Sequence, residues 1–311
     1  MGAYDILVIG RPSVDLIFTG LPSWPAVGRE IYARNLVVSA GGTFNVVAAL
    51  HRLGLRVGLI GSVGNDPWSE QALIGMRNEG VATDLIQRLD HPLPNLSICM
   101  AHDGDRGFLT YDPVDDEVSG ACTAHALSLL KRAEATFLQC CLNPDLAAYA
   151  KLAHERGMRV IVDFCWDEPW LSSHQVWTLA ALADIIFANE PEAQTVTGED
   201  DPVKALRRLA ELSPIVVVKR GADGASAIVD GREYHAPTTP VEVVDATGAG
   251  DCFNAGFLYG LLHQRPIGEC LRYGNICGGL SVTASGGFAG APTEEELLAR
   301  ARALDVASVE G

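Results

Sequence analysis

The sequence predicts an α/β fold in which a mainly parallel sheet is covered by helices. Short apolar runs, most of them rich in valine and isoleucine, alternate with longer stretches whose apolar residues recur every three or four positions. The short runs are typical of strands buried on both faces, and the long stretches are typical of amphipathic helices. Strand followed by helix, repeated along the chain, predicts a parallel sheet with helical crossovers.

The elements follow one another in the order that this fold requires. Strands are expected at six short runs, which are residues 5–10, 57–64, 135–140, 159–164, 184–190 and 214–221. Helices are expected at four amphipathic stretches, which are residues 44–54, 68–80, 146–158 and 202–213. Several of these stretches end at glycine, as helix C-termini often do.

Two segments, residues 15–40 and 96–112, break this rhythm. The first holds strand-like pieces separated by proline and glycine, and the second is typical of a hairpin with Asp103 and Gly104 at its turn. Neither fits a strand–helix–strand unit, so both are interpreted as a small β lid beside the main sheet. With no internal repeat and no long linker, residues 1–311 are expected to form a single domain into which the lid is inserted.

Composition excludes several classes of protein. The 311 residues are 48% hydrophobic and carry a formal net charge of -16, from 23 Lys+Arg against 39 Asp+Glu. Such an acidic chain is a poor candidate for binding the backbone of a nucleic acid or an anionic membrane. No apolar stretch approaches the roughly 18 residues of a membrane span. Because the N-terminus shows no secretory signal, a cytoplasmic location is expected.

The eight cysteines are interpreted as free thiols, most of them buried, in a reducing cytosol. None forms a C-x-x-C pair, and no cysteine–histidine cluster has the spacing of a zinc site. Cys252, which directly follows an acidic residue, is interpreted as a small packing residue. The remaining cysteines are Cys99, Cys122, Cys140, Cys141, Cys165, Cys270 and Cys277.

The stretch "VVDATGAGDCFNAGFLYGLL", residues 243–262, joins a strand-like run to a helix through a loop of small residues. Gly248 and Gly250 allow a ligand to approach the backbone closely, and the helix N-terminus that follows can bind an anion. Asp251 falls in or near the first helical turn, where an acid often serves as a cap. Because a cap does not need a loop of such small residues, the pattern favours a phosphoryl cradle with Asp251 facing the attacking group.

This loop resembles the C-terminal signature of the ribokinase-like (PfkB) carbohydrate kinase family, D-A-T-G-A-G-D followed by a helix. "GGTFNVVAALHRLG", residues 41–54, is similar to the N-terminal signature of the same family. The resemblance covers essentially the whole chain and implies a ribokinase-like three-layer sandwich. Other phosphate-binding and nucleophile motifs are missing, because there is no Gly-Lys pair, no G-x-G-x-x-G after the first strand and no G-x-S-x-G.

At the acceptor end, the resemblance implies that Asp251 is the catalytic base. It also implies an anion hole made by the backbone of Gly248, Ala249 and Gly250. The positions that match the sugar contacts of the family are Asp15, Gly41, Gly42, Asn45 and, in the lid hairpin, Arg106. If the resemblance is set aside, the alternative interpretations are a strand-end acid for Asp15, a helix cap for Asn45 and a solvated turn residue for Arg106. The first signature is one residue shorter here than in ribokinase, which bears on the identity of the sugar.

At the nucleotide end, the resemblance implies ATP and Mg²⁺. Asn189 and Glu192 match the N-x-x-E motif, in which the glutamate acts on Mg²⁺ through water. The alternative interpretation is a capping box, and both can hold together. The other positions that match the ATP contacts of the family are Lys219, Gly221 and Gly224 along the nucleotide and Asn275 near the adenine.

Members of the family often bind a monovalent cation such as K⁺ beside the anion hole. The alternative role for the first acid of the loop, Asp245, is a hydrogen bond that stabilises the loop. The matching positions, which contribute mostly carbonyl groups, are Asp245, Thr247, Ser281, Ala284, Gly286 and Gly290.

The resemblance therefore implies an ATP-dependent kinase that phosphorylates a primary hydroxyl of a small sugar, with a homodimer formed through the strand edges of the lid. A nucleoside kinase is the first alternative, because Cys140 and Cys141 stand near the position where ribokinase has an acidic sugar contact. Its base could stack on aromatic residues that otherwise serve core or lid packing, which are Phe44, Phe108, Tyr111 and Trp166. A non-catalytic sugar or nucleotide sensor is a further alternative, which the intact Asp251 and glycine loop disfavour.

Overall fold

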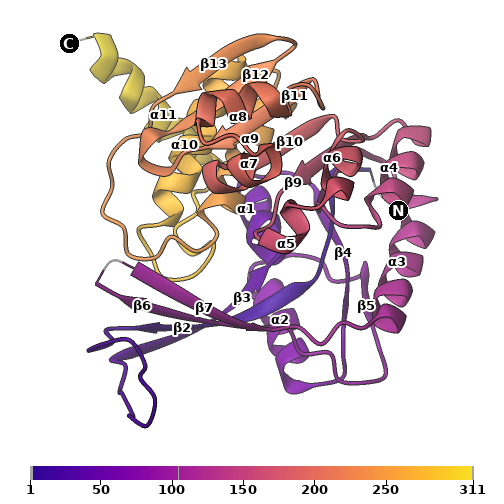
Figure 1. Ribbon diagram of the computed structural model, residues 1–311, viewed down its shortest axis with the longest axis vertical. Helices are drawn as coiled ribbons and strands as arrows, with labels where there is room; N and C mark the ends of the chain where they lie inside the picture. Colours follow the sequence, from indigo (N-terminus) through magenta and orange to yellow (C-terminus); the bar gives the residue numbers. More distant parts are fainter. Residues whose placement is uncertain (1–2, 104, 310–311) are drawn as a thin grey trace.

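The computed structural model describes residues 3–103 and 105–309, apart from the side chains of residues 105–106 and 305–309. A nine-stranded sheet runs through the molecule in the order β13-β12-β11-β10-β9-β8-β1-β4-β5 (Figure 1). Neighbouring strands in this sheet are parallel, except that β12 pairs antiparallel with both β11 and β13. The strands are β1 (Tyr4–Ile9), β4 (Val57–Val63), β5 (Ile86–Arg88), β8 (Ala135–Cys141), β9 (Arg159–Asp163), β10 (Ile185–Asn189), β11 (Ile215–Lys219), β12 (Ala225–Val229) and β13 (Arg232–Ala236).

Helices cover both faces of this sheet, which gives the three layers that the sequence predicts. Strand side chains alternate between the faces, so that Ile6 and Val8 pack into one apolar cluster and Leu7 and Ile9 into the other. The first cluster receives α1 (Phe44–Arg52), α2 (Pro67–Asn78), α9 (Ala249–Leu262), α10 (Ile267–Ser281) and α11 (Glu294–Val309). The second receives α3 (Asp116–Leu130), α4 (Leu146–Glu155), α5 (Glu168–Leu171), α6 (His174–Ala180), α7 (Glu190–Thr197) and α8 (Pro202–Leu209).

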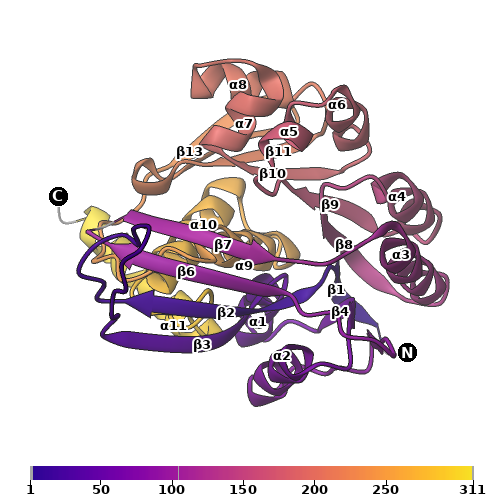
Figure 2. The same ribbon diagram turned by 60° about the horizontal axis from the view of Figure 1, so that its bottom comes forward.

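The lid is a separate four-stranded sheet that projects from one side of the main body (Figures 1 and 2). Its strand order is β3-β2-β6-β7, with β2 (Pro12–Thr19), β3 (Asn35–Gly42), β6 (Leu96–His102) and β7 (Asp105–Tyr111). Strands β2 and β3 reach three residues before and two residues after the predicted segment 15–40. β6 and β7 form the expected hairpin, and Asp103 has a positive φ of 50°. Gly104, predicted at the same turn, lies outside the described residues.

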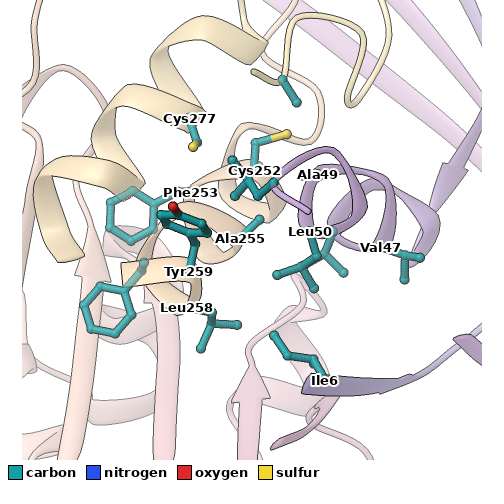
Figure 3. Close-up of a cluster of buried hydrophobic side chains, with 14 of the residues drawn as sticks. Ile6, Val47, Ala49, Leu50, Cys252, Phe253, Ala255, Leu258, Tyr259 and Cys277 are labelled. Carbon is teal, nitrogen blue, oxygen red and sulfur yellow. The ribbon is translucent and has the colours of Figure 1, made fainter. Parts of the chain in front are cut away.

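Helix α9 lies at the centre of the first apolar cluster. Figure 3 shows its side chains packed between α1 and α10, among them Cys252, Phe253 and Leu258. Cys252 is fully buried, and burial raises the pKa of its thiol to about 12, which agrees with the packing role predicted for it. Because α9 is fixed along this length, the residues at its N-terminus are fixed as well.

Candidate active site

The loop before α9 is shaped by a glycine at the N-cap of the helix. Gly248 has a φ of 67°, and a Cβ there would lie 2.0 Å from the carbonyl oxygen of Gly287. No side chain can therefore be accommodated at Gly248 without moving the backbone of the following loop. The chain enters α9 through a partly buried loop of small residues, and a helix N-terminus is a place where anions bind.

Asp251 stands in the first turn of α9 and lines a large cavity. Burial and the negative charge of Asp163 raise the pKa of Asp251 to about 7, against the opposing effects of Lys219 and of a hydrogen bond from Asn45. A carboxyl group with this pKa is half ionised near neutral pH. It can therefore take a proton from an alcohol and release it again at the working pH of most enzymes.

Asp15 lies on lid strand β2, opposite β3, and 5% of it is exposed. A Cβ at Gly41 would lie 2.0 Å from the Asp15 carboxylate, so a glycine is needed at that position for the acid to occupy its place. Burial raises the pKa of Asp15 to about 6, although a hydrogen bond donated by Ser13 Oγ opposes the shift. The negative charge of Asp15 also contributes to the raised pKa of Asp251, so the two acids lie near each other.

Asn45, on the first turn of α1, completes this group. Its side chain is 4% exposed and lines the same cavity as Asp251 and Gly42. Its Oδ1 atom has no hydrogen-bond partner among the described residues. Gly287, whose carbonyl lies against Gly248, also leaves room for the Asn45 amide, because a Cβ there would lie 2.3 Å from Asn45 Oδ1. The two sequence signatures thus meet through Asn45 and Asp251, although 200 residues separate their beginnings.

A buried ionic cluster lies beside the start of α9. Lys219 Nζ lies 3.0 Å from Asp163 Oδ1 and 3.3 Å from Asn254 Oδ1, and Asn254 Nδ2 donates to Asp163 Oδ2 at 2.6 Å. Although burial opposes its charge, the neighbouring carboxylates Asp163 and Glu192 raise the pKa of Lys219 above its ordinary value. The ammonium group is also next to Gly250, because a Cβ there would lie 3.2 Å from Nζ. A fixed positive charge therefore adjoins the bare loop.

The capping-box interpretation of Asn189 and Glu192 is confirmed. Asn189 Oδ1 accepts from the Glu192 N–H, and the Glu192 carboxylate accepts from the Asn189 N–H, both at 2.8 Å. Burial and the charge of Asp163 raise the pKa of Glu192 to about 7. Two buried acids that disfavour each other's ionisation are suited to a cation between or beside them. Among the described residues no cluster of three or more ligand side chains forms a metal cage, so a cation there would keep water or phosphate ligands.

The remaining residues predicted at the nucleotide end lie on two turns and on α10. Gly221 and Gly224 flank a short 3-10 turn after β11 with positive φ, and a Cβ at Gly224 would lie 2.1 Å from the Ala236 carbonyl oxygen. Asn275 donates to the same carbonyl at 2.9 Å and lines a small cavity of about 30 Å³. Asn275 therefore holds the end of β13 at this cavity.

The residues predicted around a monovalent cation are partly brought together. Asp245 is 6% exposed, and its two oxygens accept from the N–H groups of Thr247 and Gly286 at 2.9 Å and 3.0 Å. Gly290 packs on the Leu280 and Ser281 carbonyls, as a Cβ there would lie 2.4 Å and 2.9 Å from them. Asp245 therefore makes the loop-stabilising hydrogen bonds that were its alternative role. Ala284 lies in the same turn-rich segment between α10 and α11.

The cavity beside Asp251 has a volume of about 800 Å³. It lies over the carboxyl ends of β1, β4, β8 and β9, which is where ligands bind in open α/β sheets. A carboxylate near neutral pKa, a helix N-terminus and polar groups around a cavity form a site suited to transferring an anionic group to a hydroxyl.

Comparison with known proteins decides the family. The model of the pfkB family carbohydrate kinases matches residues 4–294. The chain belongs to the pfkB family of carbohydrate kinases. Members of this family are phosphotransferases that act on an alcohol group, so this protein is an enzyme of that class.

Relatives within the family differ in their acceptors. The chain is 27% identical to a ribokinase of Bacillus subtilis over 94% of this chain and 98% of that one. It is 28% identical to a cytidine kinase of Thermococcus kodakarensis, in a match that covers 87% of this chain and 93% of the cytidine kinase. The structure of Arabidopsis thaliana ribokinase complexed with ribose and ATP superposes with a TM-score of 0.76 and is 22% identical in sequence. The superposition covers 96% of this chain and 98% of the ribokinase. This pfkB protein therefore has the ribokinase fold and the activity of a sugar or nucleoside kinase.

Sequence reasoning did not find Asp163 and Asn254 in this pfkB site. Asp163 is the last residue of β9, and a polar side chain at the carboxyl end of a buried strand was the available signal. Asn254 follows Asp251 by three positions on α9 and is fully buried. Nothing in the sequence says that these two side chains, 91 positions apart, share a hydrogen bond.

One prediction about the cysteines is wrong. Cys141, the last residue of β8, and Cys165, two residues after the end of β9, form a disulfide instead of being free thiols. The parallel pairing of these strands places Cys141 opposite Asp163, which brings Cys165 within reach. The other six cysteines, all within the described residues, form no disulfide, and Cys122 is only partly buried. The Arg106 side chain, predicted over the acceptor, lies outside the described part of the chain.

Proposed function

We propose that the protein transfers the γ-phosphoryl group of ATP to a primary hydroxyl of a small sugar. The observation that carries this proposal is the position of Asp251. The acid lies in the first turn of a helix that follows a loop of small residues, interacts with the charge of Lys219, and shares a cavity with Asn45. A base, an anion site and hydrogen-bonding groups for an alcohol thus surround one point.

In the proposed reaction, Asp251 orients the acceptor hydroxyl and takes its proton as the new P–O bond forms. In a loose transition state the proton leaves late, so positioning of the hydroxyl matters more than the strength of the base. The N–H groups of Gly248, Ala249 and Gly250 would stabilise the charge on the transferred group. Lys219 next to Gly250 would add to this stabilisation.

The sugar would be held by the residues of the first half of the chain. Asp15 can accept bonds from two neighbouring hydroxyls, and the Asn45 amide can both donate and accept. The orphaned Oδ1 atom of Asn45 supports this role, because a buried acceptor without a partner is suited to a ligand hydroxyl. Gly41 and Gly42 would let the sugar approach the backbone, and Arg106 would cover it from the lid.

ATP would lie along the turn that follows β11, with Lys219, Gly221 and Gly224 beside it and Asn275 near the adenine. Mg²⁺ would be held at Glu192 through water, since a cation there would offset the repulsion between the Glu192 and Asp163 carboxylates. When bound with ATP, the ion neutralises charge on the phosphates.

A monovalent cation such as K⁺ is proposed where Asp245 and Thr247 meet the loop of Ser281, Ala284, Gly286 and Gly290. The support is the packing of Gly290 against the Leu280 and Ser281 carbonyls, because such oxygens are typical ligands for hard cations. The measurement is activity in K⁺ buffer against tetramethylammonium buffer at equal ionic strength. Equal rates in the two buffers would contradict the proposal.

The nucleoside alternative receives less support from the aromatic residues. Phe44 is fully buried and packs edge-on against Phe288, with ring centroids 5.3 Å apart, so it cannot stack on a base. Phe108, Tyr111 and Trp166 are 51%, 58% and 57% exposed. The alternative stays open because the cytidine kinase is a relative.

The experiment that tests the proposed function is ADP release from Mg-ATP with ribose, fructose, inositol, adenosine and cytidine as acceptors. Turnover of a free sugar is expected, and Asp251→Asn should lower kcat at least about a hundredfold, as expected when a general base is lost. The variant keeps the shape of the side chain, so unchanged ATP affinity and melting temperature serve as its control. Full turnover by a folded Asp251→Asn protein would refute the role of this acid.

A homodimer through the lid and a cytoplasmic location are proposed as well. The lid carries exposed apolar side chains on its edge strands β3 and β7, among them Leu36, Val38 and Leu109. Sedimentation at micromolar concentration tests the dimer, and a clean monomer would contradict it. None of the helices in the described ranges combines the length and apolar character needed to cross a membrane. The disulfide is an objection to a reducing cytosol, so fractionation of cells should test the location.

A further inference from the structure

The cavity beside Asp251 extends across the edge of the main sheet. Asp251 belongs to α9, which covers one face of the sheet, whereas Ser119 and Thr123 of the same cavity belong to α3, which covers the other face. The volume of about 800 Å³ lies near the upper end of the roughly 300–1,000 Å³ that small-molecule sites occupy. The cavity therefore continues well beyond the group of Asp251 and Asn45.

Two buried polar side chains in this cavity lack partners. Gln139 on β8 is 3% exposed and Ser62 on β4 is 1% exposed, and both line the cavity. Gln139 Oε1 and Ser62 Oγ have no hydrogen-bond partner within the described ranges. Buried polar atoms are nearly always hydrogen-bonded in native proteins, so these two are suited to hydrogen-bond a ligand. They lie near the ends of strands on either side of β1, but on opposite faces of the sheet. Gln139 pairs in register with Val8 and so faces the side of α1 and α9, whereas Ser62, two residues after Ile60, faces the side of α3.

The charges around the cavity exclude an anionic extension. Arg11 is the only basic side chain among the described residues that line it, and Arg11 forms an ion pair with Asp112. Five carboxylates line it. Asp112 is paired with Arg11 and Asp163 with Lys219, and the charge of the other three would repel a phosphate or carboxylate on the far part of the acceptor. The five acids are Asp112, Asp116, Asp145, Asp163 and Asp251.

The far end of the cavity is not built to stack on a nucleobase. Tyr149 is the only aromatic side chain among the described residues of the lining, and it is 4% exposed with its hydroxyl donating to Thr123 at 3.3 Å. Thr123 in turn donates to Asp145 at 2.6 Å. A wall of hydroxyl and carboxylate groups recognises the hydroxyls of a sugar ring better than the flat face of a base.

We propose that the natural acceptor is a glycoside of at least two rings. One ring presents its primary hydroxyl to Asp251 on the side of Gln139, and a second, uncharged and hydroxylated ring lies over the end of β4, bonded to Ser62, and reaches α3. This proposal rests on the proposed function, of which it names the acceptor class.

The test compares acceptors that share one ring. ADP release is measured with fructose and with sucrose, turanose and maltulose, which carry a second ring on fructose at different positions, and with cytidine and adenosine. At least one disaccharide should have a kcat/KM at least tenfold above that of fructose. A higher kcat/KM for fructose than for every disaccharide, or the highest value for a nucleoside, would overturn the proposal.

Calorimetry separates this proposal from the proposed function. The same compounds are titrated into the protein without ATP, so that binding is measured even if no acceptor is phosphorylated. Binding of a disaccharide at least tenfold tighter than fructose supports the extended site whatever the outcome for turnover. Equal or weaker binding of all three disaccharides would refute the extended site while leaving a kinase for single sugars intact.

Two substitutions on α3 locate the second ring. Ser119→Leu places a larger side chain in the cavity, whereas Ser128→Leu makes the same change on an exposed position of that helix. The ratio of disaccharide to fructose affinity should fall at least tenfold in Ser119→Leu and stay at the wild-type value in Ser128→Leu. Ser62→Ala should lower the same ratio about tenfold, because it removes a hydrogen bond to the second ring. An unchanged ratio in a folded Ser119→Leu protein would contradict the proposed placement.

Discussion

The pKa of Asp251 leads to a quantitative expectation for the pH dependence of the reaction. Burial raises the pKa of this carboxyl to about 7, and only its ionised form can accept a proton. The ionised fraction is about one tenth at pH 6 and about nine tenths at pH 8. The value of kcat/KM should therefore rise about tenfold between these pH values, with an inflection near 7.

The assay is ADP release at subsaturating acceptor and saturating Mg-ATP, in buffers of constant ionic strength from pH 5 to pH 9. Asp15→Asn serves as the second protein, because burial raises the pKa of Asp15 to about 6 and it could produce an inflection of its own. An inflection near 7 that persists in Asp15→Asn belongs to Asp251 or to a group coupled with it. A flat profile, or an inflection near 4, would refute the reasoning from burial.

The raised pKa of Asp251 also makes the stability of the folded protein depend on pH. Asp251 binds a proton more tightly in the folded protein than in the unfolded chain, where its pKa is near 3.8. Stability from this group is therefore fully present below about pH 4 and is lost as the pH rises toward 7. Asp251→Asn should flatten this decline in the free energy of unfolding between pH 4 and pH 7, as measured by urea denaturation, and an identical slope in both proteins would contradict it.

Three further substitutions test the architecture of the site. Gly248→Ala forces a side chain against a backbone carbonyl at positive φ, so kcat should fall at least about a hundredfold, the range seen when one donor of an oxyanion hole is lost. Lys219→Met leaves Asp163 buried without its ion partner, so the free energy of unfolding should fall by about 3 kcal/mol in urea. The same variant should move the pH inflection of the reaction upward, since Lys219 lowers the pKa of the neighbouring base. Reduction of the Cys141–Cys165 bond, which spans 24 positions, should lower the free energy of unfolding by about 3.5 kcal/mol in the chain-entropy estimate.

Each of these expectations has a control. Gly120→Ala on α3, where an added Cβ meets nothing within 4 Å, should leave kcat unchanged, and an equal loss in both alanine variants would refute the argument from Gly248. For Lys219→Met, the melting temperature reports folding, and an unchanged inflection would contradict the electrostatic link. For the disulfide, peptide mapping without reductant must first recover the linked peptides, and two free thiols there would show that the bond is absent.

Much of the fold follows from local sequence patterns. The strand and helix periodicities predicted β1, β4, β8, β9, β10 and β11 and the helices α1, α2, α4 and α8, because a buried strand and an amphipathic helix each show a local pattern of apolar residues. Helices α3, α5, α6 and α7 were not predicted from periodicity. The lid was recognised by its departure from that rhythm. The predicted bounds of its first segment were a few residues short at each end, since β2 begins at Pro12 and β3 ends at Gly42, which lines the cavity beside Asp251.

The sequence by itself determined the family, the bare loop before α9 and the position of Asp251 at the first turn, because these depend on residues that are neighbours in the chain. The tertiary structure alone decided the cluster of Lys219, Asp163 and Asn254, the disulfide and the cavity that reaches α3. These features join strand ends and helices from distant parts of the chain. Their distances depend on the pairing order of the sheet, and the raised pKa values that follow depend on burial, which no local pattern of residues specifies.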